Sequence, residues 1–292
     1  MKAAPPWQTW LFLLATASAI LSMGIIQPDL TAQAFILVAL VAVFGLPHGA
    51  LDLPIAQKLW PLEGWRGTLR FSTLYLGIAG LVLIFWIIAP GAALVAFLAY
   101  SSVHFSADWD DSPAILRWTG GIATIAAPAL FHRHEVMQIF GYLAPPSSAE
   151  PVATGLAALG VAALIGLAGA LALRSDLRGR AALEQGTLWV AALSLAPILY
   201  FVVYFCALHS VRHMTEALDW TKDRRTAAWT AVLLSGLTVV AAGVASMLIR
   251  ASDPISIEDT ISKTVFIGLA ALTVPHMLLV DRFQRHARRN PA

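Results

Sequence analysis

The chain consists mainly of long apolar runs separated by short polar segments. Most runs have about the 20 residues that an α-helix needs to cross ~30 Å of hydrocarbon. The runs cover residues 10–26, 34–53, 71–89, 92–109, 152–173, 188–208, 227–249 and 264–280. The pattern predicts an all-α fold, a polytopic transmembrane helical bundle of about eight spans, with residues 1–292 in a single integral membrane domain. The first run could instead be a cleaved signal peptide, but we expect a retained helix because other apolar runs follow directly.

One further apolar stretch, residues 118–131, allows two interpretations. It is shorter than the others and contains Gly120, Gly121 and Pro128. If it crossed the membrane, the 19 Lys and Arg residues would divide almost evenly between the two sides, whereas most of them share one side if it does not cross. The positive-inside rule favours the second arrangement. We therefore expect a re-entrant or interfacial segment, in a chain of the cell (inner or plasma) membrane with a cytoplasmic C-terminus.

Composition agrees with a membrane protein and excludes several functions. Hydrophobic residues make up 58% of the chain and charged residues 12%, against roughly 25% charged residues in a soluble domain. No long polar stretch is present, so a separate nucleotide-binding domain has no room. The formal net charge of +2 is small and does not indicate nucleic-acid binding. The single cysteine, Cys206, excludes an internal disulfide.

Histidines recur toward the C-terminal ends of four of these runs. They are His48, His104, His209, His213 and His276. In the eight-span arrangement these four runs all point toward the cytoplasm, so the imidazoles lie at similar depth. A lone intramembrane histidine is more often hydrogen-bonded to a neighbouring helix than bound to a metal. Five histidines at convergent positions reverse that expectation and indicate a metal site.

Acidic residues accompany two of the histidines at helical spacing. Asp52 follows His48 by four residues and Asp108 follows His104 by four, which places each pair on one helix face. A carboxylate in the membrane is costly, so it needs a partner. We expect both aspartates to accept the second N–H of a ligating imidazole.

His209 and His213 form a second kind of pair. They are four residues apart, close enough on one helix to hold one ion, and Glu216 follows three residues later. Neutral imidazoles suit iron, copper, nickel or zinc rather than magnesium or calcium. The His-Glu-x-x-His motif of zinc proteases is absent. The three remaining histidines lie in a loop segment or the basic tail, so a mononuclear site fits better than a di-iron centre.

Two other classes of function stay open on these residues alone. A haem-binding membrane cytochrome would use histidines of neighbouring helices as haem ligands, and a metal or proton transporter would use histidines and acids as a relay. A relay should extend across the bilayer, whereas these ionisable groups gather toward one side. A Soret band in the purified protein would identify a haem site.

Four short motifs are specific as a set. They are residues 45–52 (GLPHGALD), His104-Phe105 with Asp108, residues 204–213 (YFCALHSVRH) and residues 275–277 (PHM). In this order and with these separations they resemble the Brp/Blh family of bacterial and archaeal β-carotene 15,15'-dioxygenases. The resemblance implies a non-haem Fe(II) enzyme of the membrane whose iron is bound by His48, His104, His209 and His213. It also implies a nearby or alternative ligand role for His276, while Ser106 stands where the family often has glycine.

The resemblance further implies the reaction, the cleavage of β-carotene by O₂ at its central double bond into two retinal molecules. Breaking one C=C bond into two aldehydes releases the four electrons that O₂ accepts, so no reductant is required. A long apolar substrate should enter a tunnel between helices that opens to the lipid bilayer. Aromatic residues near the histidines are candidates for the tunnel walls: Phe44, Phe105, Trp109, Tyr204 and Phe205. A retinal-accepting partner cannot be identified from the sequence.

Overall fold

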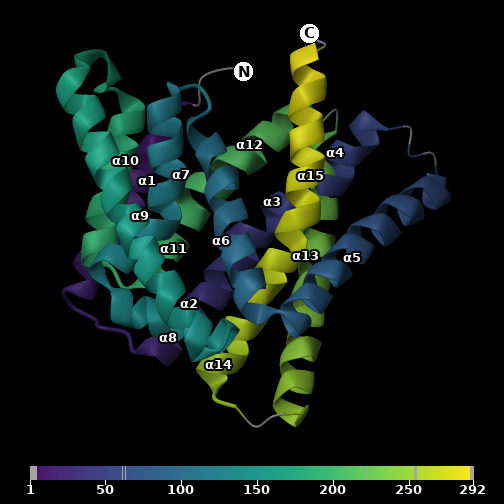
Figure 1. Ribbon diagram of the computed structural model, residues 1–292. Helices are drawn as coiled ribbons and strands as arrows, with labels where there is room; N and C mark the ends of the chain where they lie inside the picture. The colour runs from purple at the N-terminus through teal and green to yellow at the C-terminus, as the bar shows by residue number, and fades with distance from the viewer. Residues whose placement is uncertain (1–4, 61, 63, 222, 253–254, 290–292) are drawn as a thin grey trace. The chain divides into compact units, whose positions relative to one another are not determined.

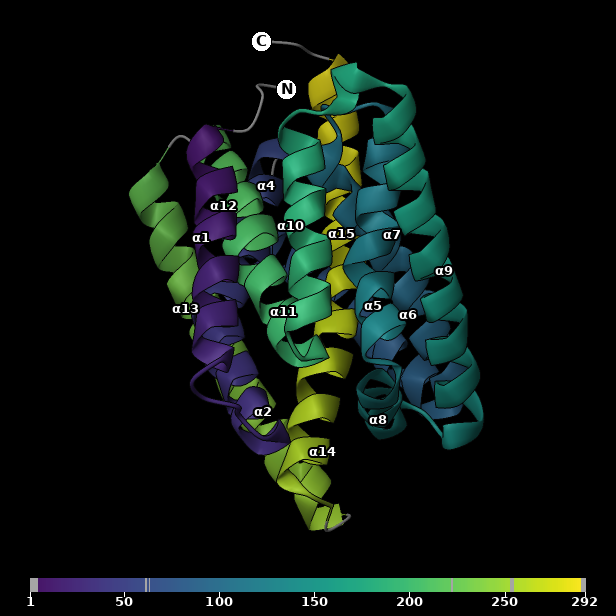
Figure 2. The same ribbon diagram turned by 90° about the vertical axis from the view of Figure 1, so that its left-hand side faces the viewer.

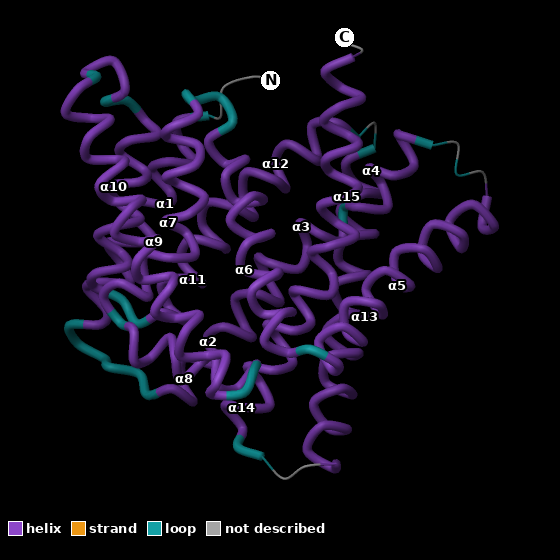
Figure 3. The backbone as a smooth tube through the Cα atoms, in the orientation of Figure 1, coloured by secondary structure: helices purple, strands orange, loops and turns teal. Residues whose placement is uncertain are grey.

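The computed structural model describes residues 5–60, 62, 64–221, 223–252 and 255–289. Within these residues every regular element is a helix, and Figure 3 shows the helices joined by short loops. By length and composition, seven helical segments of the described residues are long and apolar enough to cross a membrane. They are Leu30–Leu59, Gly64–Ile88, Pro90–Trp109, Ala114–Phe131, Pro146–Leu173, Arg224–Ser252 and Ile257–Arg282. The predicted all-α, multi-pass bundle is confirmed.

The helices divide into α-helices and shorter irregular segments. The α-helices are α1 (Pro6–Met23), α2 (Leu30–Leu40), α3 (Leu46–Ala50), α4 (Asp52–Leu59), α5 (Gly64–Ile88), α6 (Pro90–Ser106), α7 (Ala114–Phe131), α8 (Arg133–Leu143), α9 (Pro146–Leu173), α10 (Arg180–Ser194), α11 (Pro197–Tyr204), α12 (Ser210–Trp220), α13 (Arg224–Ser252), α14 (Ile257–Ser262) and α15 (Gly268–Arg289). The π-helices are η1 (Val41–Gly45), η4 (Phe205–His209) and η5 (Lys263–Ile267), and the 3₁₀ turns are η2 (Ala107–Trp109) and η3 (Ser175–Leu177).

The chain clusters into two compact units, each made of two separate stretches. Unit 1 contains Met1–Leu40 and Pro90–Arg212, and unit 2 contains Val41–Ala89 and His213–Ala292. The sequence led us to expect a single membrane domain, and that expectation stays a prediction. Each unit has its own helix packing and its own group of histidines.

The centre of unit 1 is α7, which packs against α6, α9 and α10 (Figure 2). Small residues allow this close approach, as in other membrane helix interfaces. A Cβ atom on Gly121 would lie 2.4 Å from the Ser102 carbonyl oxygen and 2.7 Å from the Ser106 Cβ atom of α6. One on Gly160 of α9 would lie 3.0 Å from the Ala126 carbonyl oxygen. These glycines therefore bring the backbones of three helices together.

Contacts between helix ends give the direction of the helices in unit 1. Gly91 at the start of α6 lies against Ser148 at the start of α9, so these two helices run parallel. Arg180 at the start of α10 forms an ion pair with Asp111, just before α7, at 2.9 Å. The α7 and α10 helices therefore also run parallel to each other. Because only the short η2 segment joins α6 to α7, this second pair runs opposite to the first.

Two predicted boundaries differ from the structure. Residues 118–131 belong to a continuous helix of 18 residues, α7, packed along α9, and not to a short re-entrant turn. The run 188–208 is divided between α10, which ends at Ser194, and α11, which begins at Pro197. Proline lacks an N–H and keeps the preceding residue out of helical geometry, which explains the break. Each change reverses the direction of the chain once more than predicted, so α6 and α11 still run in the same direction.

Unit 2 has an apolar core where the α3–α4 corner meets α12, α13 and α15. The core residues are Leu51, Ile55, Ala56, Ala217, Ala227, Ala231 and Leu279. Helix α15 also packs along α5, as Figure 1 shows. Large apolar side chains are exposed along α13, at Leu233, Leu237, Val240, Val244 and Leu248. A continuous apolar face of this kind suits contact with lipid rather than water.

Candidate functional site

The first group of interest, the His209 cluster of unit 1, consists of His104, Asp108, Tyr204, His209 and Arg212. The Nε2 atoms of His104 and His209 are 3.1 Å apart. The Nδ1 atom of His209 lies 3.2 Å from a carboxylate oxygen of Asp108, and the Tyr204 hydroxyl donates to the same oxygen at 2.5 Å. Because an ionised carboxylate only accepts hydrogen bonds, His209 carries its proton on Nδ1. Its Nε2 lone pair therefore points toward His104.

Aromatic rings enclose His209. The ring centroid of Phe105 lies 4.8 Å from that of His209 in an edge-to-face arrangement. Phe205 stacks on the imidazole at 5.7 Å and Tyr204 at 6.2 Å. All three aromatic side chains are buried, so they keep water away from the His209–Asp108 hydrogen bond and strengthen it. Three of the predicted tunnel residues thus form a packed wall around this imidazole.

The second group, the His276 cluster of unit 2, consists of His48, Asp52, Tyr75, His213 and His276. The Nδ1 atom of His276 lies 2.7 Å from Asp52 Oδ1, and the Tyr75 hydroxyl donates to Asp52 Oδ2 at 2.8 Å. The three imidazole rings meet edge to face, with centroids 4.9 Å apart for His213–His276, 5.4 Å for His48–His276 and 5.6 Å for His48–His213. Ligand atoms of Asp52, His213 and His276 all lie within 4.8 Å of one another.

Irregular helical segments position these imidazoles. The π-helix Phe205–His209 contains a clustered histidine, Val41–Gly45 ends three residues before His48, and Lys263–Ile267 precedes the helix that carries His276. A π turn holds one extra residue, so it changes the face on which the following side chains lie. The first π-helix also supplies a direct contact, because the Gly45 carbonyl accepts a hydrogen bond from Nδ1 of His48.

Each aspartate bonds a histidine of a different helix, not the histidine four residues before it. Asp52 pairs with His276, and Asp108 pairs with His209. The reason is local: α3 ends at Ala50 and α6 ends at Ser106, so the regular helix stops between each histidine and its aspartate. The spacing of four residues therefore does not keep the two side chains on one face.

The donor set of each cluster fits an imidazole-bound transition metal. Two nitrogens held by one ion at ~2.1 Å, with about 90 to 110° between the bonds, are about 3.0 to 3.4 Å apart. The 3.1 Å separation of His104 and His209 falls in that range. Metal-binding histidines usually donate their other N–H to a carboxylate or a carbonyl. His209 and His276 have a carboxylate there, and His48 has a carbonyl.

Comparison with known proteins identifies the family. A family model described as beta-carotene 15,15'-dioxygenase matches residues 39–284. The chain belongs to the β-carotene 15,15'-dioxygenase family. It is 32% identical over 268 residues to the β-carotene 15,15'-dioxygenase of uncultured marine bacterium 66A03, an alignment that covers 86% of this chain and 94% of the relative. The predicted resemblance is confirmed.

A second relative is more distant. The chain is 28% identical over 218 residues to a protein of Halobacterium salinarum named probable β-carotene 15,15'-dioxygenase Blh, with 64% of this chain and 63% of the relative covered. No solved structure matches the chain. The segment that the family model matches contains every member of both clusters, whereas α1 and most of α2 precede it.

Other residues predicted for the site occupy varied positions. Glu216 lies half-buried in α12, one turn beyond the histidine pair. Phe44, in the first π-helix, is 45% exposed and so is not part of an enclosed wall. Trp109 is buried and stacks on Tyr204 with ring centroids 6.5 Å apart. Of the tunnel candidates in this family member, the four from unit 1 are buried and the one from unit 2 is exposed.

Three residues that support the clusters were not predicted from the sequence. Tyr75 donates to Asp52, Arg212 donates to the Asp108 main-chain oxygen at 2.7 Å, and Glu184 accepts from Arg212. Polar side chains within apolar surroundings usually have a partner, and that signal could have identified Tyr75 and Glu184. Their partners could not have been named, because they lie far away in the sequence.

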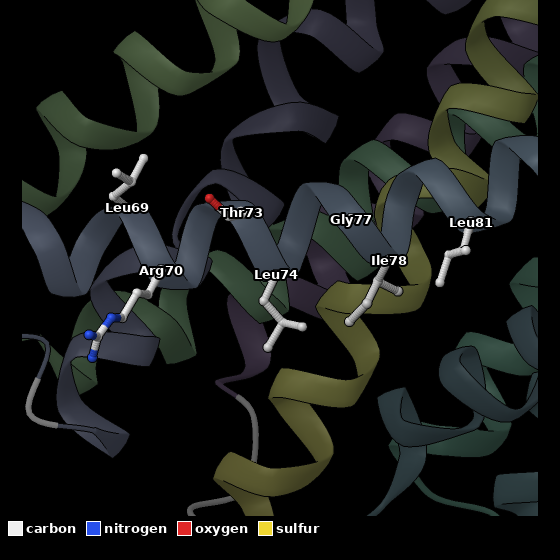
Figure 4. Close-up of a pocket in the computed structure, with 7 residues that line it drawn as sticks. All are labelled: Leu69, Arg70, Thr73, Leu74, Gly77, Ile78 and Leu81. Atoms are coloured by element: carbon white, nitrogen blue, oxygen red, sulfur yellow. The ribbon is translucent and has the colours of Figure 1, made fainter.

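A surface groove of about 620 Å³ runs along α5 (Figure 4). Its lining residues all come from that helix: Leu69, Arg70, Thr73, Leu74, Gly77, Ile78 and Leu81. Tyr75 and the buried Ala79 and Trp86 lie on another face of the same helix. The groove is thus not continuous with the His276 cluster, and its exposed leucines suit contact with lipid.

Proposed function

We propose that this chain is a non-haem Fe(II) dioxygenase that splits β-carotene, or a related carotenoid, with O₂ at its central double bond into two retinal molecules. The observation that carries the proposal is the pair of Nε2 atoms of His104 and His209, 3.1 Å apart, with buried Asp108 on the far nitrogen of His209. Family membership supports the substrate, since the relative from the marine bacterium is named for this activity.

The proposed reaction balances without a second cofactor. One C=C bond breaks, each carbon gains one oxygen atom of O₂, and four electrons pass from the two carbons to oxygen. Iron, when bound, supplies the redox chemistry that allows O₂ to react with an alkene. Neither NAD(P)H nor another reductant enters the balance.

The protein's own residues orient the ligands and exclude water. Asp108 keeps the proton of His209 on Nδ1, so that Nε2 presents its lone pair. Asp52 does the same for His276. The aromatic wall around His209 gives apolar surroundings that suit a polyene. With no charge on the substrate to recognise, the shape of the binding site should select the bond that is cleaved.

For the metal ligands we keep the four histidines predicted from the sequence, His48, His104, His209 and His213. Support comes from each unit separately: the close Nε2 atoms in unit 1 and the edge-to-face rings in unit 2. His276 is the alternative ligand, because its ring lies 4.9 Å from that of His213 and its Nδ1 atom is held by a carboxylate.

A haem cytochrome is less compatible with the geometry of unit 1. Two axial histidines on opposite faces of a haem need nitrogens about 4 Å apart, since each bond is ~2.0 Å long. The 3.1 Å separation of His104 and His209 leaves no place for a porphyrin between them.

The basic residues of unit 1 support an orientation. Arg117, Arg174, Arg178, Arg180 and Arg212 lie at the end of the unit where α6 and α9 finish, and Arg133 lies at the opposite end. By the positive-inside rule we propose that the histidine end faces the cytoplasm, in the cell (inner or plasma) membrane. The C-terminus is proposed to be cytoplasmic as well, as the basic tail indicates.

Product analysis of the purified protein tests this function. The protein is stripped of metal, reloaded with Fe(II) or Zn(II), and given β-carotene with measured O₂. We expect the iron form to produce two retinal molecules for each O₂ consumed, without NAD(P)H, and the zinc form to be inactive. Retinal formation without O₂ or iron would reject the proposal, as would a stable iron form that cleaves no carotenoid.

A further inference from the structure

Glu184 is a fully buried acid that the proposed reaction does not use. It lies on α10 with 0% of its surface exposed. Its Oε1 atom accepts hydrogen bonds from the Thr9 hydroxyl of α1 at 2.5 Å and from the Arg212 guanidinium at 2.5 Å. Its Oε2 atom accepts from the Trp109 indole at 3.1 Å. An ionised acid at such a position is costly unless it is paired and hydrogen-bonded, and both conditions are met here.

The Glu184–Arg212 pair holds two consecutive residues of η2. Arg212 donates to the main-chain oxygen of Asp108 at 2.7 Å, while Glu184 accepts from the side chain of Trp109. The short η2 turn is therefore fixed at its backbone and at its last side chain. This turn carries the Asp108 carboxylate that contacts Nδ1 of His209. Any movement of η2 would change that contact.

Close packing fixes the position of Trp109 as well. A Cβ atom on Gly120 of α7 would lie 2.4 Å from the Trp109 ring, so the indole rests directly on the helix backbone. A further neighbour is Tyr204, whose ring is stacked with that of Trp109 at an angle of 21° and a centroid distance of 6.5 Å. Because the indole cannot shift toward α7, its N–H has a fixed direction, and Glu184 lies in it.

We propose that Glu184, with Arg212, is a positioning residue that holds Asp108 against His209, and that Thr9 makes α1 part of this support. The inference rests on the proposed function, since it concerns the geometry of a proposed iron ligand. A buried ion pair is a weak source of stability, because apolar side chains of similar volume often stabilise a fold as well. Arg212 and Glu184 each bond one of two adjacent residues of η2, so we infer that the pair serves to fix the position of that turn.

The test compares Glu184→Gln with Gln185→Met. Gln185 is the matched control because it is also 0% exposed on α10, but its hydrogen bonds go to Thr119 and Leu116 of α7. Both variants lose a buried polar interaction of the same helix. The readouts are iron content after dialysis and the EPR spectrum of the Fe(II) protein with nitric oxide, which reports ligand geometry. Glu184→Gln should retain iron about 10-fold more weakly and change the spectrum. Losses of this size follow when a residue that supports a metal ligand, without binding the metal, is replaced.

Gln185→Met should keep the wild-type spectrum and iron content. A wild-type spectrum and iron content in Glu184→Gln would overturn the proposal, and so would equal changes in both variants. If wild type itself binds no iron and forms no retinal, the proposed function fails first. An active, iron-loaded wild type with an unaffected Glu184→Gln would reject this inference alone.

A second variant covers the case in which Glu184→Gln does not accumulate because Arg212 loses its ion-pair partner on α10. The double variant Glu184→Gln/Arg212→Met removes both charges and should restore accumulation in the membrane while the EPR spectrum stays altered. A double variant with a wild-type spectrum, or one that also fails to accumulate, would overturn the positioning role. Thr9→Val should shift the spectrum in the same direction but less, and no shift would exclude α1 from the support.

Discussion

The His209 and His276 clusters use the same three residue types in different surroundings. In each, an aspartate accepts hydrogen bonds from the Nδ1 atom of a histidine and from a tyrosine hydroxyl. Around His209 the neighbours are aromatic rings and a buried ion pair. Around His276 the neighbours are the rings of two further histidines. These neighbours of His209 are thus aromatic rings and an ion pair, whereas those of His276 are further candidate ligands.

The difference indicates where each cluster should be sensitive. Packing fixes the His209 cluster whether or not a metal is present, so changes in its wall should affect both stability and metal binding. In the His276 cluster the neighbouring rings are themselves candidate ligands, so changes there should affect metal binding more than folding. The three imidazoles of this cluster are in edge-to-face contact, and a metal that bound them would hold them together. Metal binding would therefore order the His276 cluster.

The largest effect is expected for His209→Ala and His213→Ala, one from each cluster. Replacing a residue that only supports a metal ligand lowers metal affinity by up to ~100-fold. Loss of a ligand itself should have a larger effect, so iron content and retinal formation should fall to background. His276→Ala separates the two roles of that residue, since a drop of only about 10 to 100-fold would identify it as a supporting side chain. Metal analysis and retinal assays on membrane-inserted protein measure all three. Robust turnover by either of the first two would break the four-histidine proposal.

The next effect compares Asp108→Asn with Asp52→Asn. Either amide weakens the hold on an imidazole N–H, and iron retention should fall by about 10 to 100-fold. Asp108→Asn should also lower the free energy of unfolding, because that carboxylate lies beside the buried Arg212 guanidinium and its charge helps to compensate that of the arginine. Thermal melts in detergent, run beside metal titrations, separate the two quantities. Equal melting temperatures for both variants would contradict the proposed difference between the clusters.

A smaller effect should follow Tyr204→Phe and Tyr75→Phe, which remove one hydroxyl each and keep the ring. A hydrogen bond to a charged group contributes about 1.5 to 3 kcal/mol, part of which should appear as a several-fold loss of iron affinity. We expect the loss for both variants, since each tyrosine bonds the aspartate of its own cluster. Competition with a chelator gives the affinities. If neither changes, the tyrosines serve helix packing alone.

The last comparison concerns stability: Gly120→Ala in unit 1, with Gly77→Ala as its counterpart in unit 2. A Cβ atom at Gly120 would overlap the Trp109 ring, whereas one at Gly77 would meet nothing within 4 Å. Overpacking of this kind typically costs about 1 to 3 kcal/mol of unfolding free energy. Chemical denaturation should therefore separate the variants, with Gly77→Ala close to wild type. A stable Gly120→Ala variant would mean that the indole has room to move.

Much of the site chemistry was readable from residue types and spacing. Histidines near the ends of four apolar runs, and aspartates in need of a partner, predicted which side chains would meet an imidazole. Which imidazole each would meet was not readable. The helices stop between each histidine and its aspartate, and each π turn rotates the side chains that come after it to another face. Regular helical geometry therefore does not give the partner of either aspartate.

Hydropathy likewise predicted the type of secondary structure but not where each helix begins and ends. Apolar content predicted an all-α fold, but the break at Leu195 and Ala196 lies inside a continuous apolar run and has no hydropathy signal. Pro197 was the available clue. The continuous α7 was also missed, because its glycines resemble the breaks of a re-entrant loop while they in fact serve close packing against Ser106 and Trp109.

The packing of α1 has a consequence for engineering retinal-forming enzymes of this family. Phe12 is fully buried and lies edge-on to Tyr204, yet it precedes the residues that the family model matches. A shortened enzyme cut at the family boundary would keep all candidate ligands and lose this contact. Chimeras that exchange the first helix between relatives should therefore exchange α10 and α11 with it, since these three helices pack as one module.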